Sequence, residues 1–394
     1  MLGGYVILSA AKDLGANSVY PTSKSFNSTQ PKLRITHYAF KSAFRIYTMT
    51  ILQDFTLSEL TQYLTANFSV KPYVAKQVFE WLTKSVDFDG MSNISKTLRK
   101  QLQENSVAVA ARIIQTRTSA DGTQKFLFEL SDRNVVEGVL MKYKYGNTLC
   151  VSSQVGCRMG CKFCASTLDG LVRNLTAGEI LSQVLSVNAL GDGGARYVTN
   201  IVLMGSGEPL DNFDNVVKFL RLVTSPDGIN ISERNISLST CGIVPRMKEL
   251  ADMGFSLNLT LSLHNADNEQ RKQIMPITNA YSVEDAISAC RYYFQKTGRR
   301  VIVEYTLIDG QNDSRAHALK LASLLRGMSV HVNVIALNPV KETGLKGTSE
   351  NNVKKFIQFL TELGLSATRR RTMGQDIEGA CGQLRRRYLN DRND

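Results

Sequence analysis

Three cysteines lie close together in the stretch Cys157-Arg-Met-Gly-Cys161-Lys-Phe-Cys164. Thiolates at spacings of four and three residues can surround one small iron–sulfur cluster, but three of them leave its fourth iron without a protein ligand. Structural zinc sites normally have four ligands, and the bacterial ferredoxin motif has two-residue gaps and a final proline. The spacing therefore favours an iron–sulfur cluster with one open iron. A zinc knuckle completed by a distant Cys or His is the alternative.

Two further cysteines and one carboxylate are candidates for chemistry outside this motif. Cys381 lies in a short segment with Gly and Ala, where an exposed reactive thiol is easier to place than a packed one. Cys150 lies in an apolar strand pattern, where a lone cysteine is usually a packing residue. Glu137 lies in the strand pattern 135–140, where a carboxylate usually faces solvent. Residue type alone leaves structural and chemical roles open for all three.

Strands and helices alternate regularly from about residue 147 onward, and these elements must position the cysteine motif. The strand patterns are 148–152, 201–204, 236–239, 257–263, 301–307 and 330–337. The helical patterns that follow them are 177–190, 213–224, 244–253, 283–296, 315–325 and 351–363. Six consecutive βα units predict an α/β fold whose parallel sheet is open or curled into a partial (β/α)6 barrel. In such folds chemistry takes place at the carboxyl ends of the strands, and the cysteine motif follows the first strand.

The residues before this region predict two smaller parts. The capping box Thr56-Leu-Ser-Glu59 starts a helical pattern, and two more amphipathic stretches cover 74–83 and 94–102. Alternating strand patterns follow at 113–118, 125–130 and 135–144. We therefore expect a small helical accessory domain at 49–110, a short antiparallel β unit at 111–146, a core at 147–388 and a tail at 389–394. Residues 1–48 are expected to be a poorly ordered extension, and Met49 is a candidate second start.

The charge and cysteine content indicate a partner and a compartment. The net charge is +12 and the isoelectric point is about 9.3, which favours a polyanionic partner such as nucleic acid. The runs Arg369–Arg371 and Arg385–Arg387 bracket Cys381 and could draw phosphates toward it. Seven cysteines are too few for a disulfide scaffold and favour a reducing cytoplasm. No stretch approaches the roughly 18 apolar residues of a membrane span, so we expect a cytoplasmic protein without membrane contact.

The cysteine motif resembles that of the radical S-adenosylmethionine (SAM) enzymes, in which the amino and carboxylate groups of SAM bind the open iron of a [4Fe-4S] cluster. Four neighbouring motifs resemble more specifically the RlmN adenine-C2 methyltransferases. They are the stretches from Cys150 to Cys157, from Gly205 to Pro209, from Ser262 to His264 and from Asp376 to Leu384. The resemblance runs from about residue 52 to 388 and implies a radical SAM barrel.

The resemblance also implies a role for each candidate residue. Cys157, Cys161 and Cys164 would hold the cluster. Cys381 would take a methyl group from one SAM, and a radical from a second SAM would activate that methyl for addition to adenine C2. Glu137 would then accept the C2 proton, and Cys150 would release the product by forming a disulfide with Cys381.

The family resemblance places SAM contacts at strand ends. The matching positions are Gly207, Glu208, Ser239, Ser262, Leu263, His264 and Asn338. A carboxylate such as Glu208 suits the SAM ammonium group on electrostatic grounds. The chain departs from the usual pattern at Ser206, where the family has Met, and at Cys241, where Ser or Val is usual. Neither departure removes a ligand, and Cys241 is expected to be structural.

The implied substrates are adenine 2503 of 23S rRNA and adenine 37 of certain tRNAs, with an electron donor such as flavodoxin and a monomeric enzyme. One alternative is the Cfr type, which methylates C8 of the same rRNA adenine. Pro209 favours the RlmN type, because Cfr-like sequences typically carry Ala after the Glu. A non-catalytic, zinc-containing RNA-binding protein is the second alternative.

Overall fold

The computed structural model describes residues 49–391 apart from 192–195, 338–340, 372 and 378–382, and the described residues belong to one compact unit. Two of the residues singled out above, Cys381 and Asn338, lie outside the described residues. None of the helices in the described ranges combines the length and the hydrophobicity of a membrane-spanning segment.

A ten-stranded sheet runs through the described part of the chain in the order β14-β13-β12-β11-β10-β9-β6-β5-β4-β3. Its strands are β3 (Ala111–Thr118), β4 (Gln124–Leu130), β5 (Val135–Tyr143), β6 (Gly146–Cys150), β9 (Asn200–Leu203), β10 (Ile236–Thr240), β11 (Asn258–Ser262), β12 (Val301–Leu307), β13 (Val330–Ala336) and β14 (Ala367–Arg369). Strand β6 and strands β9–β14 pair in parallel. Strands β3–β6 pair antiparallel, so β6 joins the two kinds of pairing in one sheet.

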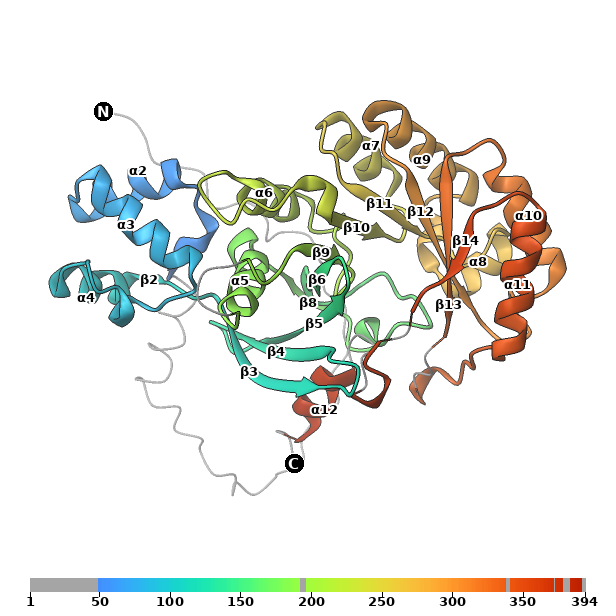
Figure 1. The fold of residues 1–394 in the computed structure, drawn as a ribbon, viewed down its shortest axis with the longest axis horizontal. Helices are drawn as coiled ribbons and strands as arrows, with labels where there is room; N and C mark the ends of the chain where they lie inside the picture. Colours follow the sequence, from blue (N-terminus) through green and yellow to red (C-terminus); the bar gives the residue numbers. More distant parts are fainter. Residues whose placement is uncertain (1–48, 192–195, 338–340, 372, 378–382, 392–394) are drawn as a thin grey trace, which may run out of the picture. The chain divides into compact units, whose positions relative to one another are not determined.

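In the described residues, one longer helix lies between each two consecutive parallel strands. These helices are α5 (Ala177–Asn188), α6 (Phe213–Thr224), α7 (Val244–Asp252), α9 (Val283–Thr297), α10 (Arg315–Leu325) and α11 (Glu350–Glu362). The six predicted βα units are confirmed, and each boundary lies within two residues of the expected one. Helices α7, α9, α10 and α11 lie outside strands β10–β14 (Figure 1).

The sheet is curled. This follows from one cavity of about 240 Å³ that side chains from distant strands line together. Met141 of β5, Thr148 of β6, Thr260 of β11 and Asn333 of β13 all border it. We call this concave side the inner face. Alternate residues point the other way and pack against the helices, as period-two strands require. The predicted partial barrel is therefore confirmed.

Elements near the ends of the described chain complete the fold. The short strands β1 (Thr50–Ile51) and β2 (Ser106–Val107) pair in parallel. Between them in the sequence lie the helices α2 (Leu57–Phe68), α3 (Pro72–Thr83) and α4 (Lys96–Asn105). These helices have their own hydrophobic core, and the Thr56–Glu59 capping box is confirmed. The boundaries at 110 and 146 stay a prediction, since β3–β5 share the sheet of the parallel region.

Some elements carry no clear sequence signal. The hairpin of β7 (Gln154–Gly156) and β8 (Leu171–Asn174), the short helix α8 (Asn268–Ile274) and the C-terminal helix α12 (Gln383–Asp391) were not expected. The hairpin strands have three and four residues, α8 contains one apolar residue and α12 is mostly polar, so hydrophobic periodicity is weak in all of them. All three border the residues discussed below.

Candidate active site

The cysteine motif lies in a loop that the hairpin β7–β8 closes. The Cys157 N–H donates to the Gly170 carbonyl at 2.9 Å, and the Cys164 N–H donates to the Cys161 carbonyl at 3.1 Å. Gly156 has a φ of 78°, and a Cβ there would lie 2.0 Å from the Gly170 oxygen. Only glycine fits this close crossing of two backbones, so Gly156 fixes where the loop begins.

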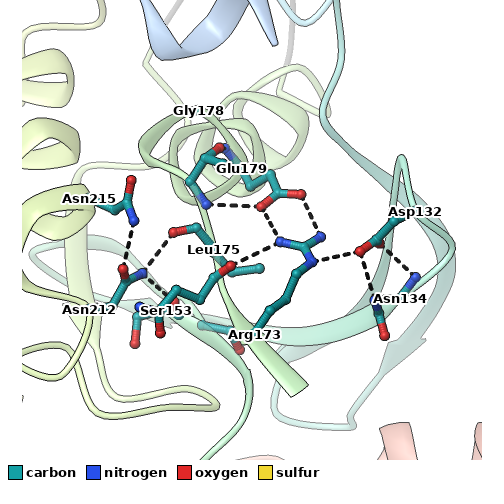
Figure 2. Close-up of polar contacts among 12 residues, drawn as sticks. Asp132, Asn134, Ser153, Arg173, Leu175, Gly178, Glu179, Asn212 and Asn215 are labelled. Atoms are coloured by element: carbon teal, nitrogen blue, oxygen red, sulfur yellow. Dashed lines mark hydrogen bonds and ion pairs between the residues drawn. The ribbon is translucent and has the colours of Figure 1, made fainter. Parts of the chain in front are cut away.

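A buried polar network anchors the closing hairpin, as Figure 2 shows. The Arg173 guanidinium lies 2.6 Å from Asp132 in the β4–β5 turn and 2.7 Å from Glu179 in the first turn of α5. Burial alone would raise the pKa of Asp132, but hydrogen bonds from Arg173 and Asn134 hold it below its usual range. The network therefore ties the cysteine loop to both the antiparallel strands and α5.

An amide links the same hairpin to the loop after β9. Asn212 Nδ2 donates to the Ser153 and Leu175 carbonyls, at 2.8 Å each (Figure 2). The loop after β9 also contains Gly207 and Glu208, so this link sets the distance between the cysteine loop and those residues.

The cysteine loop and the carboxyl ends of five parallel strands, β9–β13, border one pocket of about 210 Å³. The expected site residues that line it are Cys157, Cys161, Cys164, Gly207, Glu208, Ser239, Ser262 and His264. The hydroxyls of Ser239 and Ser262 lie 3.3 Å apart. The Leu263 side chain instead lies in the hydrophobic core. The structure thus brings together most of the residues expected to contact the cofactors, although their roles stay a prediction.

Glu208 is buried and fixed by the backbone around it. Its carboxylate accepts hydrogen bonds from the N–H groups of Cys241 at 2.8 Å and Leu210 at 3.1 Å. Burial raises the pKa of Glu208 in spite of these hydrogen bonds. Cys241 lines the same pocket, and burial followed by repulsion from Glu208 raises the pKa of its thiol well above the usual value. A cationic ligand group would relieve the burial cost of the Glu208 carboxylate.

His264 is held as a neutral ring. It has a φ of 55°, and its Nδ1 accepts a hydrogen bond from the Thr306 N–H at 3.0 Å. Burial, followed by repulsion from Arg271, lowers the pKa of His264 to about 3. Because Nδ1 is an acceptor, the proton is on Nε2, which leaves His264 a hydrogen-bond donor at neutral pH. The ring packs edge-on against Phe163 of the cysteine motif.

Arg271 of α8 is a site residue that sequence reasoning missed. It is 1% exposed, and its guanidinium donates to the carbonyls of Cys241, Ser262 and Leu263 and to the Thr278 hydroxyl, at 2.7–3.1 Å. All four acceptors are neutral, and burial lowers its pKa. A buried cation with neutral acceptors needs a nearby anion, and a thiolate at Cys161 would be one. The short helix α8, which carries Arg271, gave no periodic signal in the sequence.

The three thiols fit an iron–sulfur cluster better than one zinc ion. Burial raises the pKa of Cys157 to about 12 and that of Cys161 beyond its usual range, so both need a metal to be thiolates at neutral pH. Among the described residues, no three His, Cys, Asp or Glu side chains converge on a single metal position. Zinc with Zn–S bonds of about 2.3 Å would need such convergence. An iron–sulfur cluster gives each thiolate its own iron, so the three thiolates need not converge on a single position.

Cys150 and Glu137 form a second group on the inner face, outside the pocket lining. Cys150 of β6 pairs with Val139 of β5, and Glu137 lies two residues from Val139, so all three side chains point to one face. Glu137 is 4% exposed, so it is not the solvated carboxylate that a strand usually carries. Its ion pair with the fully buried Lys125 at 3.2 Å explains the burial. The sequence signal for this ion pair was the presence of opposite charges in two adjacent strand patterns.

Two family models match this chain. The model described as the radical SAM superfamily matches residues 151–322, which include the cysteine motif. The model described as the ribosomal RNA large subunit methyltransferase N-terminal domain matches residues 50–108, which include α2–α4.

Full-length relatives and a solved structure are also similar. The probable dual-specificity RNA methyltransferase RlmN of Clostridium novyi (strain NT) is 49% identical over 345 residues, covering 86% of this chain and 99% of that protein. Its counterpart in Clostridium perfringens (strain SM101 / Type A) is 50% identical, with coverage of 86% and 98%. A crystal structure of a radical SAM methyltransferase from Sphaerobacter thermophilus is 41% identical with a TM-score of 0.81, covering 85% of this chain and 98% of that one.

Proposed function

Because this chain belongs to the RlmN family of dual-specificity RNA methyltransferases, we propose that it methylates C2 of adenine 2503 in 23S rRNA and of adenine 37 in tRNAs. The observation that carries this proposal is the single pocket in which three thiols face Glu208, Ser239, Ser262 and His264. The enzyme is a radical SAM RNA methyltransferase that uses a [4Fe-4S] cluster and SAM.

Cys157, Cys161 and Cys164 would hold the cluster, and the strand-end residues would hold SAM. When bound, the cluster supplies one electron that cleaves SAM to a hydrogen-abstracting radical. Glu208 is oriented by two backbone N–H groups and can pair with the SAM ammonium group. The His264 Nε2–H can donate to a SAM oxygen or nitrogen. Asn338 is proposed as a further SAM contact by resemblance.

Three further residues would act on the methyl group and the adenine. The Cys381 thiolate attacks the methyl carbon of SAM. The bond from that carbon to the SAM sulfur breaks, and S-adenosylhomocysteine leaves. The SAM-derived radical would remove one hydrogen atom from the methyl group on Cys381, and the resulting carbon radical would add to C2. Loss of the C2 proton to Glu137 and of one electron, which the cluster would take back, would restore the adenine ring. The Cys150 thiolate would then attack the Cys381 sulfur and form a disulfide. The electron pair of the broken carbon–sulfur bond would go to the methylene carbon, which takes up a proton to become the methyl group. The resulting disulfide must be reduced before the next turnover.

The net charge of +12 supports an RNA partner, and the exposed Arg371 and Arg387 would contact its phosphates. Arg385, which the sequence placed in the same group, is buried and donates to the Val135 carbonyl instead. The target adenine must leave its stack to present C2. We further propose a cytoplasmic, monomeric enzyme that receives electrons from a donor such as flavodoxin.

The test is anaerobic reconstitution with iron, sulfide, SAM and a reductant, using a 23S rRNA fragment and a tRNA in separate reactions. Mass spectrometry of the digested nucleosides locates the new methyl group. We expect 2-methyladenosine from both substrates, and none with Cys381→Ala. Methyl on C8 would instead place the enzyme with the Cfr type.

A further inference from the structure

The antiparallel strands contact the C-terminal part of the chain on both sides of Cys381. We propose that strands β3–β5 position the segment that carries this thiol, by means of two anchors. The first anchor joins the β3–β4 turn to residues 374–376, and the second joins Glu137 to the start of α12. The inference rests on the proposed function in so far as Cys381 is the methyl acceptor.

The first anchor is a reciprocal pair of carboxylate contacts. The Gly374 N–H donates to Asp121 at 3.0 Å, and the Ala120 N–H donates to Asp376 at 3.1 Å. The Ser119 hydroxyl also donates to Asp376. The hydrogen bond from Gly374, followed by those from Thr123, lowers the pKa of Asp121 to about 2. Both carboxylates therefore stay charged, and the anchor stays formed, at neutral pH.

The second anchor is the carboxylate of Glu137. One oxygen lies 3.2 Å from Lys125 Nζ, and the other accepts a hydrogen bond from the backbone N–H of Arg385, in the first turn of α12. N–H groups in a first turn have no acceptor within their helix, and a negative charge there is favourable. Glu137 therefore stabilises the start of α12 from a neighbouring strand.

Further contacts seat α12 on the antiparallel strands (Figure 1). Leu384 is buried against Leu127 and Val135, and Arg385 Nε donates to the Val135 carbonyl at 2.8 Å. Arg385 also approaches Asp169 at 3.8 Å, in the loop after the cysteine motif. The helix thus contacts both the sheet and the loop that would hold the cluster.

The two anchors limit where Cys381 can lie. Cys381 follows Asp376 by five residues and precedes Arg385 by four. A fully extended chain of four residues spans about 14 Å, so Cys381 cannot lie farther than that from Arg385. Glu137 shares its face with Cys150, the thiol expected to react with Cys381. The anchors therefore fix the two chain ends that flank the segment of Cys381, and the second anchor lies on the face of the sheet that carries Cys150.

Positioning and proton removal by Glu137 would act at different stages. Positioning is needed when Cys381 takes its methyl group, before any RNA is present. Proton removal is needed only after the methyl carbon has joined the adenine. An amide at position 137 can still accept the Arg385 N–H but is not a base. Glu137→Ala and Glu137→Gln should therefore fail at different stages.

The experiment measures two properties of the reconstituted full-length enzyme without RNA. Hydrogen exchange reports the protection of residues 383–391, and mass spectrometry reports the rate of methyl transfer from SAM to Cys381. For Glu137→Ala we expect at least about tenfold faster exchange and at least about tenfold slower methylation, because a hydrogen bond to a charged group is lost. Glu137→Gln should keep both the exchange rate and the methylation rate of the wild type. Once RNA is added, this variant should accumulate a covalent enzyme–RNA adduct.

The controls separate positioning from general damage. Glu59 also accepts a backbone N–H, from Thr56 at 2.8 Å, so Glu59→Ala should loosen α2 and leave α12 and Cys381 methylation unchanged. If Glu137→Gln folds poorly, a Lys125→Met/Glu137→Gln variant also removes the buried ammonium whose ion pair with Glu137 is lost, and it should behave as Glu137→Gln. Wild-type exchange and methylation in Glu137→Ala would overturn the proposal. Absence of Cys381 methylation in the wild type would instead overturn the proposed function, while the exchange result still tests the anchor.

Discussion

The parallel strands β9–β12 and the antiparallel strands β3–β5 present their polar side chains in different ways. In the parallel region, Glu208, Ser239, Ser262 and His264 lie at or just beyond the carboxyl ends of β9, β10 and β11 and meet in one pocket, because the carboxyl ends of parallel strands lie at one edge. In the antiparallel region, Lys125 and Glu137 lie within strands and are buried as a pair.

The difference concerns what each arrangement can hold. Strand ends of the parallel region surround a pocket, which suits small cofactors. The antiparallel strands instead offer a face and a turn, and these contact another part of the same chain through Asp121 and Glu137. We therefore expect substitutions in the parallel region to alter stability and cofactor content, and substitutions in the antiparallel region to alter the C-terminal segment.

The largest expected effect comes from the entry to the cysteine loop. Gly156→Ala would place a Cβ 2.0 Å from the Gly170 oxygen, so the loop must move. We expect the free energy of unfolding to fall by about 4–5 kcal/mol and the iron content after reconstitution to fall as well. Gly170→Ala is the matched control, because its φ is also positive but no atom lies within 4 Å of the new Cβ. It should cost only about 1–2 kcal/mol, and equal losses would show that the close crossing is unimportant.

The next effect comes from the buried cation. Arg271→Met removes a donor from the carbonyls of Cys241, Ser262 and Leu263, although the Leu263 carbonyl keeps the Asn265 N–H as a donor. We expect urea unfolding to show a loss of about 2–3 kcal/mol, together with less bound iron. Lys272→Met removes a neighbouring cation whose ion pair with Glu269 is exposed, and it should change stability by less than about 1 kcal/mol. Similar results for the two variants would contradict a special role for Arg271.

The pH dependence of stability should reflect His264. Its pKa is lowered to about 3 in the folded state by burial and by Arg271, whereas the unfolded chain protonates it near its ordinary value. The unfolded state therefore takes up the proton as the pH falls, and folded-state stability falls with it. We expect His264 to account for a loss of about 2 kcal/mol between pH 7 and pH 5. Urea unfolding at pH 7 and pH 5 gives the difference in the free energy of unfolding between wild type and His264→Gln. If this difference were the same at both pH values, His264 would not cause the pH dependence.

A smaller effect is expected where the two regions meet. Asp132→Asn weakens the contact between the β4–β5 turn and Arg173, although Arg173 keeps its ion pair with Glu179. We expect a loss of about 1–2 kcal/mol in urea unfolding. Asp87→Asn is the control, because the Asp87–Arg112 pair is half-exposed and should contribute less than about 1 kcal/mol. If Asp132→Asn were equally mild, the hairpin would not depend on the antiparallel strands.

The sequence alone determined the fold class and most of the cofactor pocket. Local periodicity marks strands and helices, so the βα units were predicted with their boundaries, and the cysteine spacing marked the loop that borders the pocket. Strand-end residues could be grouped because parallel connectivity places them at one edge. The pattern could not locate α8 or α12, because their mostly polar sequences show little hydrophobic periodicity.

Only the tertiary structure decided the contacts that join distant parts of the chain. Arg385 meets Glu137 across 248 positions, and Gly374 meets Asp121 across 253. The period of a strand gives the face of a charged residue but not its partner or its burial, which depend on the elements packed against that face. Arg271 illustrates the same limit, because its acceptors are backbone carbonyls whose positions follow from the fold and not from their residue types.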